Sequence, residues 1–160
     1  MKKAIVYYSM SGNTDYVANR ISEKLDADLI RISPKKEYPN KGVMKFFWGG
    51  KSAVMGETPE LENYEFDSEK YDTIIFGSPV WASSFTPPIR TFIKDNMEKL
   101  KDKKIAVFIC SMGGGSAKTI EKLKQFLQID NFEAELELID PKDKQSDEKD
   151  KKIEEFIEKF

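Results

Sequence analysis

Residues 4–14 read AIVYYSMSGNT, a stretch in which two patterns meet. The apolar run Ala4–Tyr8 passes directly into a loop of small polar residues, Ser9–Thr14. Apolar residues then recur at helical spacing between Val17 and Leu25. The stretch therefore predicts a buried strand, a polar loop and the start of an amphipathic helix.

A polar loop at a helix start can hold a phosphate group. The first turn of a helix presents backbone N–H groups without intrahelical partners, together with the positive end of the helix dipole. Gly12 would let the backbone close around an anion. Further donors are the side chains of Ser9, Ser11, Asn13 and Thr14. The alternative is a capped turn without a ligand, which is the usual role of such residues before a helix.

The chain has the size and composition of one globular domain. Its 160 residues are 39% hydrophobic and 34% charged, with a formal net charge of -2, so we expect a single domain over residues 1–160. The slightly negative net charge does not indicate the large basic surface that is typical of a nucleic-acid-binding protein. No apolar run approaches the roughly 20 residues of a membrane span, and the first apolar run is too short for a signal peptide. We expect a cytoplasmic protein that binds neither nucleic acid nor membrane.

Composition also excludes several kinds of catalytic site. The chain contains no histidine and one cysteine, Cys110. Ser-His-Asp and Cys-His catalysis, an internal disulfide and most zinc sites are therefore ruled out. Cys110 ends the apolar run Ile105–Ile109, where we expect a small core residue and not a nucleophile. We predict no catalytic side chain and no metal ligand.

Strands alternate with helices along the rest of the chain. The expected strands are Lys3–Tyr8, Asp28–Ile32, Thr73–Phe76, Ile105–Ile109 and Glu133–Ile139. Helical spacing of apolar residues indicates further helices at Ile89–Leu100, Ile120–Leu127 and Ile153–Phe160. This alternation predicts an α/β fold with a five-stranded parallel sheet and helices on both faces. The last strand alternates apolar residues with glutamates, which is typical of an edge strand.

The connection Ser33–Asp72 is unusually long. It contains an apolar segment, Val43–Trp48, and we expect a short helix from about Gly42 to Met55, although Gly49–Gly50 weakens that expectation. The aromatic residues Phe46, Phe47 and Trp48 would pack over a sheet edge or helix. A lid or a partner surface is the alternative.

Three loops fall at the same end of the predicted sheet. The first is the Ser9–Thr14 loop. The second, Gly77–Pro88, holds Trp81 in a stiff, proline-rich frame, and the third, Ser111–Ser116, is rich in glycine, so its backbone can approach a flat ligand. Together they offer an anion site, a stacking face and a rim of backbone polar groups.

Flavin mononucleotide (FMN) has the matching parts: one terminal phosphate, a polyol spacer and a planar ring. Trp81 could stack on the ring. The backbone around Val80, Ala82, Met112 and Gly113 could bond its pyrimidine edge. Trp81 could equally be a core aromatic that anchors its loop.

At three places the sequence resembles the flavodoxin family. The matching segments are Tyr8–Thr14, Tyr71–Trp81 and Cys110–Gly115, and the resemblance extends over nearly the whole chain. It implies a doubly wound flavodoxin-like sheet in the order 2-1-3-4-5, noncovalent FMN, and one-electron transfer between redox partner proteins. The cofactor-binding residues predicted from these segments are Ser9, Met10, Ser11, Gly12, Asn13, Thr14, Pro79, Val80, Trp81, Ala82, Ser111, Met112, Gly113, Gly114 and Gly115.

The third loop departs from the family pattern. Many flavodoxins carry a tyrosine there that covers the outer face of the ring, whereas this loop has Met112 and glycines. The Pro79–Trp81 loop followed by Pro87–Phe92 also resembles NAD(P)H-dependent flavin or quinone reductases of the same fold. An electron carrier, monomeric or weakly dimeric, is the first expectation. An FMN-dependent oxidoreductase is the second, and a binder of phosphorylated ligands without flavin is the third.

Charge is unevenly distributed along the chain. Residues 57–80 carry seven acidic side chains and one basic side chain, and they lead into the second loop. If this segment lies near the ring, it would lower the flavin potential and steer a basic partner toward it. A solvated acidic loop without function is the alternative.

Overall fold

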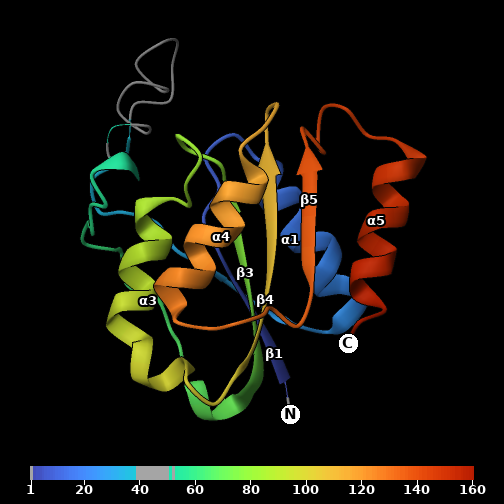
Figure 1. Cartoon of the computed structure of the whole chain (residues 1–160). Coiled ribbons are helices and arrows are strands. Elements are labelled where there is room, and N and C mark those ends of the chain that lie inside the picture. The colour runs from blue at the N-terminus through green and yellow to red at the C-terminus, as the bar shows by residue number, and fades with distance from the viewer. Residues whose placement is uncertain (1, 39–50, 52) are drawn as a thin grey trace.

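A five-stranded parallel sheet forms the centre of the molecule in the computed structural model, which describes residues 2–38, 51 and 53–160 (Figure 1). The strands lie in the order β2-β1-β3-β4-β5, and every neighbouring pair is parallel. Their bounds are β1 (Lys2–Tyr7), β2 (Asp28–Arg31), β3 (Tyr71–Pro79), β4 (Lys104–Ser111) and β5 (Glu135–Ile139). The predicted fold class and strand order are confirmed.

Helices cover both faces of the sheet. They are α1 (Asn13–Leu25), α3 (Pro87–Leu100), α4 (Ser116–Leu127) and α5 (Asp147–Ile157), with a short 3-10 helix, η1 (Ser68–Lys70), before β3. Helices α1 and α5 lie on one face, and α3 and α4 on the other (Figure 1). Among the described residues, no helix is both long and apolar enough to span a bilayer.

Burial on both faces explains why the central strands are apolar throughout. In β4, Val107 packs with α3 and α4, whereas Phe108 packs with α1 and α5. The Phe108 ring lies against Gly77 of β3, where an added Cβ would stand 2.2 Å from Phe108 Cζ. A side chain at Gly77 would therefore displace this ring.

At the β5 edge, the predicted alternation is confirmed. Leu136 and Leu138 are buried, whereas Glu135 and Glu137 are exposed. The strand begins at Glu135, two residues later than predicted, although the chain already bonds to β4 before it: Glu133 N donates to Ile105 O over 2.8 Å, and Val107 N donates to Ala134 O over 3.0 Å.

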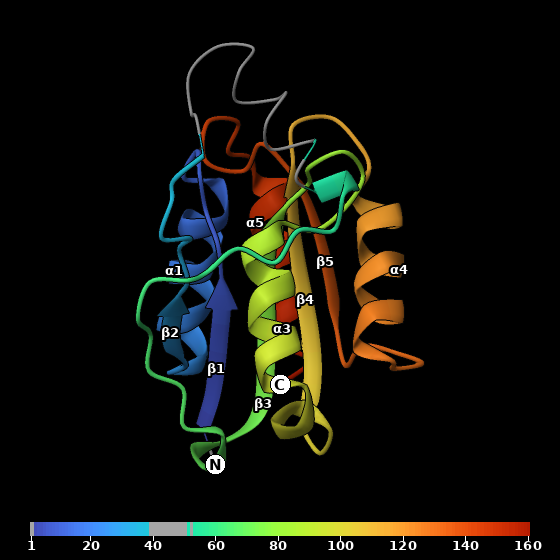
Figure 2. The same ribbon diagram turned by 90° about the vertical axis from the view of Figure 1, so that its left-hand side faces the viewer.

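The long connection after β2 first follows the sheet edge. Its two described parts are joined where Pro34 pairs with Leu61 and where Lys35 N donates to Glu60 O over 2.8 Å. The chain then descends past the β2 edge, where residues 64–67 lie beside β2, and reaches η1 at the amino ends of the strands (Figure 2). The connection is thus anchored to the domain along most of its described length.

Much of the predicted Gly42–Met55 helix lies outside the described residues, as do Phe46, Phe47 and Trp48. At its end, Lys51, Ala53 and Val54 are helical. Met55 N donates to Lys51 O over 3.0 Å, a helical bond.

Candidate functional site

Three loops meet at the carboxyl ends of β1, β3 and β4 and enclose a cavity of about 280 Å³. The chain adds β2 on one side of β1 and then crosses over to add β3 on the other side, so the cavity lies at the switch point where open parallel sheets bind ligands. Its lining residues are Met10, Ser11, Asn13, Pro79, Val80, Trp81, Ala82, Ser83, Cys110, Met112, Gly113 and Gly114. The other predicted residues, Ser9, Gly12, Thr14, Ser111 and Gly115, do not line it.

The first loop offers backbone donors where α1 begins. Gly12, the N-cap residue, has a φ of 98°, in the left-handed region that favours glycine. Tyr16 N donates to Gly12 O over 2.9 Å, the first bond of the helix. The N–H groups of Asn13 and Thr14 precede this bond and have no intrahelical acceptor. They can therefore serve an anion.

The side chains of this loop are arranged differently from the prediction. Ser9 Oγ accepts from Asp15 N over 3.1 Å and so caps α1. Thr14 is buried, and its side chain hydrogen-bonds Cys110. Ser11 is exposed and lines the cavity. Ser9 and Thr14 therefore stabilise the loop itself, and Ser11 remains available to a ligand.

The Asn13 side chain was predicted to be a free donor, but both of its polar atoms are hydrogen-bonded within the protein. Its Nδ2 donates to Asp140 Oδ1 over 3.2 Å, and its Oδ1 accepts from Lys142 N over 3.0 Å. Asn13 thus ties the loop between β5 and α5 to the start of α1. No local sequence signal marks this role, because the partners are about 130 positions away in the chain.

A tight turn holds the second loop. Trp81 N donates to Ser84 O over 2.9 Å, and Ser84 N donates to Trp81 O over 3.0 Å. Between them, Ala82 and Ser83 have φ values of 50° and 57°. Positive φ at both central positions is the geometry of a type I′ turn, which is strained for residues other than glycine, asparagine and aspartate.

Trp81 is packed against two tyrosines and also lines the cavity. Its ring is perpendicular to that of Tyr8, with centroids 5.7 Å apart, and nearly perpendicular to that of Tyr38, at 5.1 Å. These edge contacts fix the plane of the indole. The ring anchors its loop and, being only partly buried, remains accessible from the cavity.

The third loop is open. Met112 is 63% exposed, and a Cβ added at Gly113 or Gly114 would meet no atom within 4 Å. Gly115 differs, because its φ is 88° and an added Cβ would lie 3.0 Å from Val80 Cγ1. Gly115 thus allows the second and third loops to approach each other, while the two preceding glycines leave the cavity open.

The chain matches the model of a known family over most of its length. The family model described as flavodoxin matches residues 2–146. The chain belongs to the flavodoxin family. No curated protein sequence matches it significantly.

Solved structures share the flavodoxin fold of this chain. A flavoprotein in complex with FMN from Lactobacillus acidophilus NCFM superposes with a TM-score of 0.76 at 21% identity, and 97% of each chain is covered. The two-electron reduced flavodoxin of Megasphaera elsdenii has a TM-score of 0.63 at 20% identity, with 99% of each chain covered. Oxidised flavodoxin 1 from Bacillus cereus has a TM-score of 0.58 at 20% identity, covering 99% of this chain and 96% of that one.

The cavity is uncharged, since no acidic or basic side chain is among the described residues that line it. Two lining residues, Ser83 and Cys110, fall outside the predicted set. Both directly adjoin predicted residues: Cys110 begins the third matching segment, and Ser83 lies in the second loop. Cys110 is also buried in the core beneath α1 and α5, as predicted, and burial raises the pKa of its thiol to about 12.

The acidic segment, residues 57–80, does not gather its charge at the cavity. Its first part crosses α3 and then passes the β2 edge to η1, where β3 begins (Figure 2). Asp67, Glu69 and Asp72 therefore lie near the amino ends of the strands, whereas the cavity lies at their carboxyl ends. The hypothesis of an acidic segment beside the ring is wrong for these residues, and a solvated acidic surface describes them better.

Proposed function

We propose that this protein binds FMN noncovalently in the cavity and carries electrons one at a time between redox partner proteins. The observation that carries the proposal is the meeting of three features at one cavity. These are the amides at the start of α1, the Trp81 ring and the open glycine-rich rim. The fold shared with the FMN complex of the Lactobacillus acidophilus flavoprotein supports the same cofactor.

The phosphate would bind at the start of α1. The amides of Asn13 and Thr14 and the hydroxyl of Ser11 supply the donors. Each hydrogen bond to a charged phosphate oxygen contributes ~1.5–3 kcal/mol. The helix dipole favours a negative charge at the same place.

The ring would lie against Trp81 and the Met112–Gly114 rim. Tyr8 and Tyr38 hold the indole plane, so that little side-chain freedom is lost when a flat ligand binds. The bound cofactor supplies the redox chemistry. The protein orients the ring, and Trp81 excludes water from the face that it covers.

The uncharged lining favours an electron carrier over a hydride-transfer enzyme. Two-electron reduction of a quinone or a free flavin also requires protons to be delivered. Cys110 is the titratable residue in the described lining, and its pKa of about 12 makes it a poor proton donor near neutral pH. One-electron exchange with a partner protein needs no such group.

Stepwise reduction of the FMN-loaded protein tests this proposal. The visible spectrum and the potential are recorded while dithionite is added, and NADPH consumption is measured separately. We expect tight FMN binding, two resolved one-electron steps and negligible steady-state use of NADPH. A protein that takes up no FMN would overturn the proposal in favour of a phosphate-binding role without flavin.

An FMN-dependent NAD(P)H oxidoreductase is the second candidate, and the open third loop favours it. Met112 is largely exposed and Gly113 and Gly114 face open space, so a second flat molecule could reach the ring. A turnover assay with both nicotinamides and a quinone separates the candidates. Rapid turnover with a single two-electron reduction step supports the oxidoreductase, whereas no turnover in the FMN-loaded protein excludes it.

A further inference from the structure

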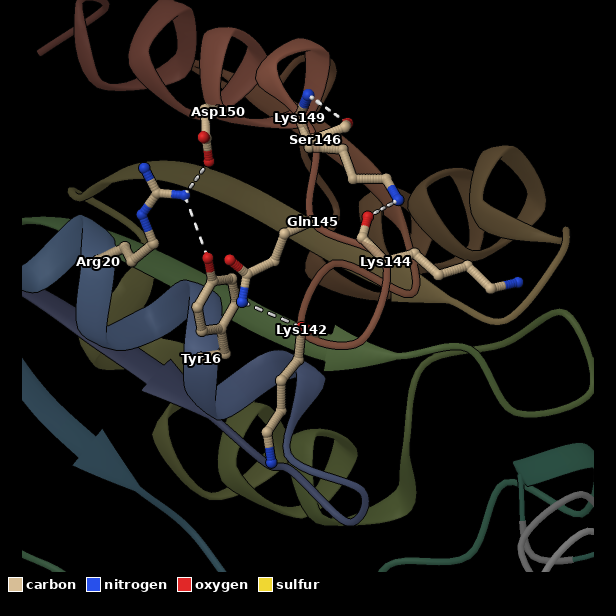
Figure 3. A network of polar contacts seen from close by, with 8 residues as sticks. All are labelled: Tyr16, Arg20, Lys142, Lys144, Gln145, Ser146, Lys149 and Asp150. Carbon is tan, nitrogen blue, oxygen red and sulfur yellow. Dashed lines mark hydrogen bonds and ion pairs between the residues drawn. The ribbon is translucent and has the colours of Figure 1, made fainter.

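The loop between β5 and α5, residues 140–146, brings a lysine to the start of α1. The exposed side chain of Lys142 runs beside the chain that leads into this helix (Figure 3). A Cβ placed on Gly12 would lie 2.9 Å from Lys142 Nζ and 3.4 Å from Lys142 Cδ. The lysine side chain therefore lies directly against the backbone of the first loop.

Several hydrogen bonds fix the loop that carries this lysine. Asn13 accepts from Lys142 N and donates to Asp140, over 3.0 and 3.2 Å. Asp140 N donates to Ser111 O over 2.8 Å, and Gln145 Nε2 donates to Lys142 O over 3.1 Å. The position of Lys142 is thus set by both the start of α1 and the end of β4.

The amino group of Lys142 is available for a ligand. Among the described residues, no carboxylate forms an ion pair with it. Nearby cations are engaged instead: Arg20 pairs with Asp150, and Lys149 Nζ donates to Lys144 O (Figure 3). An unpaired cation beside amides that also lack acceptors suits a doubly charged anion.

We propose that Lys142 binds the phosphate of FMN, so that the β5–α5 loop completes the cofactor site; this inference rests on the proposed function. The start of α1 supplies neutral donors, and Lys142 adds the full positive charge that the first loop lacks. Glycine is favoured at position 12 for two reasons: its φ is positive, and the absence of a Cβ leaves room for the amino group of Lys142. Riboflavin, which has no phosphate, gains no affinity from Lys142.

Binding of FMN and riboflavin to full-length apoprotein tests the role of Lys142. Flavin fluorescence is titrated at low and high salt for wild type, Lys142→Gln, Lys142→Arg and the matched control Lys144→Gln. Lys144 belongs to the same loop, but its side chain points away from the start of α1 (Figure 3). Thermal unfolding of each apoprotein checks that the variants fold.

We expect Lys142→Gln to weaken FMN binding by roughly two- to fivefold, as for one exposed charge pair, and to leave riboflavin binding unchanged. The salt dependence of FMN binding should fall as well. Lys142→Arg should retain most of the affinity, and Lys144→Gln should behave as wild type. Phosphorus NMR gives an independent readout, because loss of the cation should raise the pH at which the bound phosphate titrates.

Two results separate the possible failures. If wild type binds FMN tightly and Lys142→Gln weakens FMN and riboflavin equally, or not at all, the role of Lys142 is overturned while the proposed function stands. If wild type binds no FMN, the proposed function is overturned and the inference with it.

Discussion

The two ends of the candidate site are built in different ways. At the α1 end, a ligand meets backbone amides and Lys142, and Asn13 links this end to Asp140, 127 positions away. At the other end, a ligand meets side chains, namely the Trp81 ring and the exposed Met112. The α1 end should therefore recognise charge, and the Trp81 end should recognise a flat surface.

The largest expected effect is at the Trp81 end. Trp81→Ala should weaken FMN and riboflavin equally, by about 2 kcal/mol, because both carry the ring that the indole would cover. Fluorescence titration with the two flavins measures this loss, and Trp81→Phe, which keeps an aromatic face, should lose less. Unchanged affinity for both flavins would limit Trp81 to anchoring its loop.

In the third loop, Gly115 lies against Val80, whereas Gly113 lies in open space. Gly115→Ala should lower the free energy of unfolding by ~1–2 kcal/mol, because a side chain there meets both a positive φ and Val80. Gly113→Ala, the matched control in open space, should change it by less than about 0.5 kcal/mol. Urea unfolding of the apoproteins measures both values. Equal losses would contradict the assignment of strain to Gly115.

Ser11 and Thr14 provide a similar contrast at the α1 end. Ser11→Ala should weaken FMN by about 1 kcal/mol and spare riboflavin, because only FMN carries the phosphate. Thr14→Ala should instead lower the stability of the apoprotein, since its buried hydroxyl bonds Cys110. Flavin titration and urea unfolding of both variants distinguish the two roles. Equal loss of both flavins in Ser11→Ala would contradict its contact with the phosphate.

The smallest effect concerns the strained turn beside Trp81. Ala82→Gly should raise the free energy of unfolding by about 0.5 kcal/mol. Glycine removes the strain of the positive φ, and this gain in free energy exceeds the cost of the greater freedom that glycine gives the unfolded chain. The denaturation midpoint measures it. A lower midpoint would mean that Ala82 is not strained.

Most of the fold was accessible to sequence analysis because its signals are local. The apolar runs Ala4–Tyr8 and Ile105–Ile109 coincide closely with β1 and β4. The three loops could be placed together because the carboxyl ends of parallel strands share one edge of the sheet. The helical spacing of apolar residues was equally informative, since each helix buries one apolar face against the sheet.

The details that sequence analysis missed depend on distant parts of the chain. The bonds of Asn13 to Asp140 and Lys142 join residues from opposite ends of the sequence. The path of the acidic segment depends on where the long connection crosses α3, which its composition does not encode. The proximity of Lys142 to Gly12 likewise follows only from how β5 and α5 pack beside α1.

The structure of this protein crystallised with FMN would test the central claim most directly. We expect the phosphate within hydrogen-bond distance of the amides of Asn13 and Thr14, and the ring against Trp81. A phosphate bound away from the start of α1, or a ring that does not touch Trp81, would contradict the account.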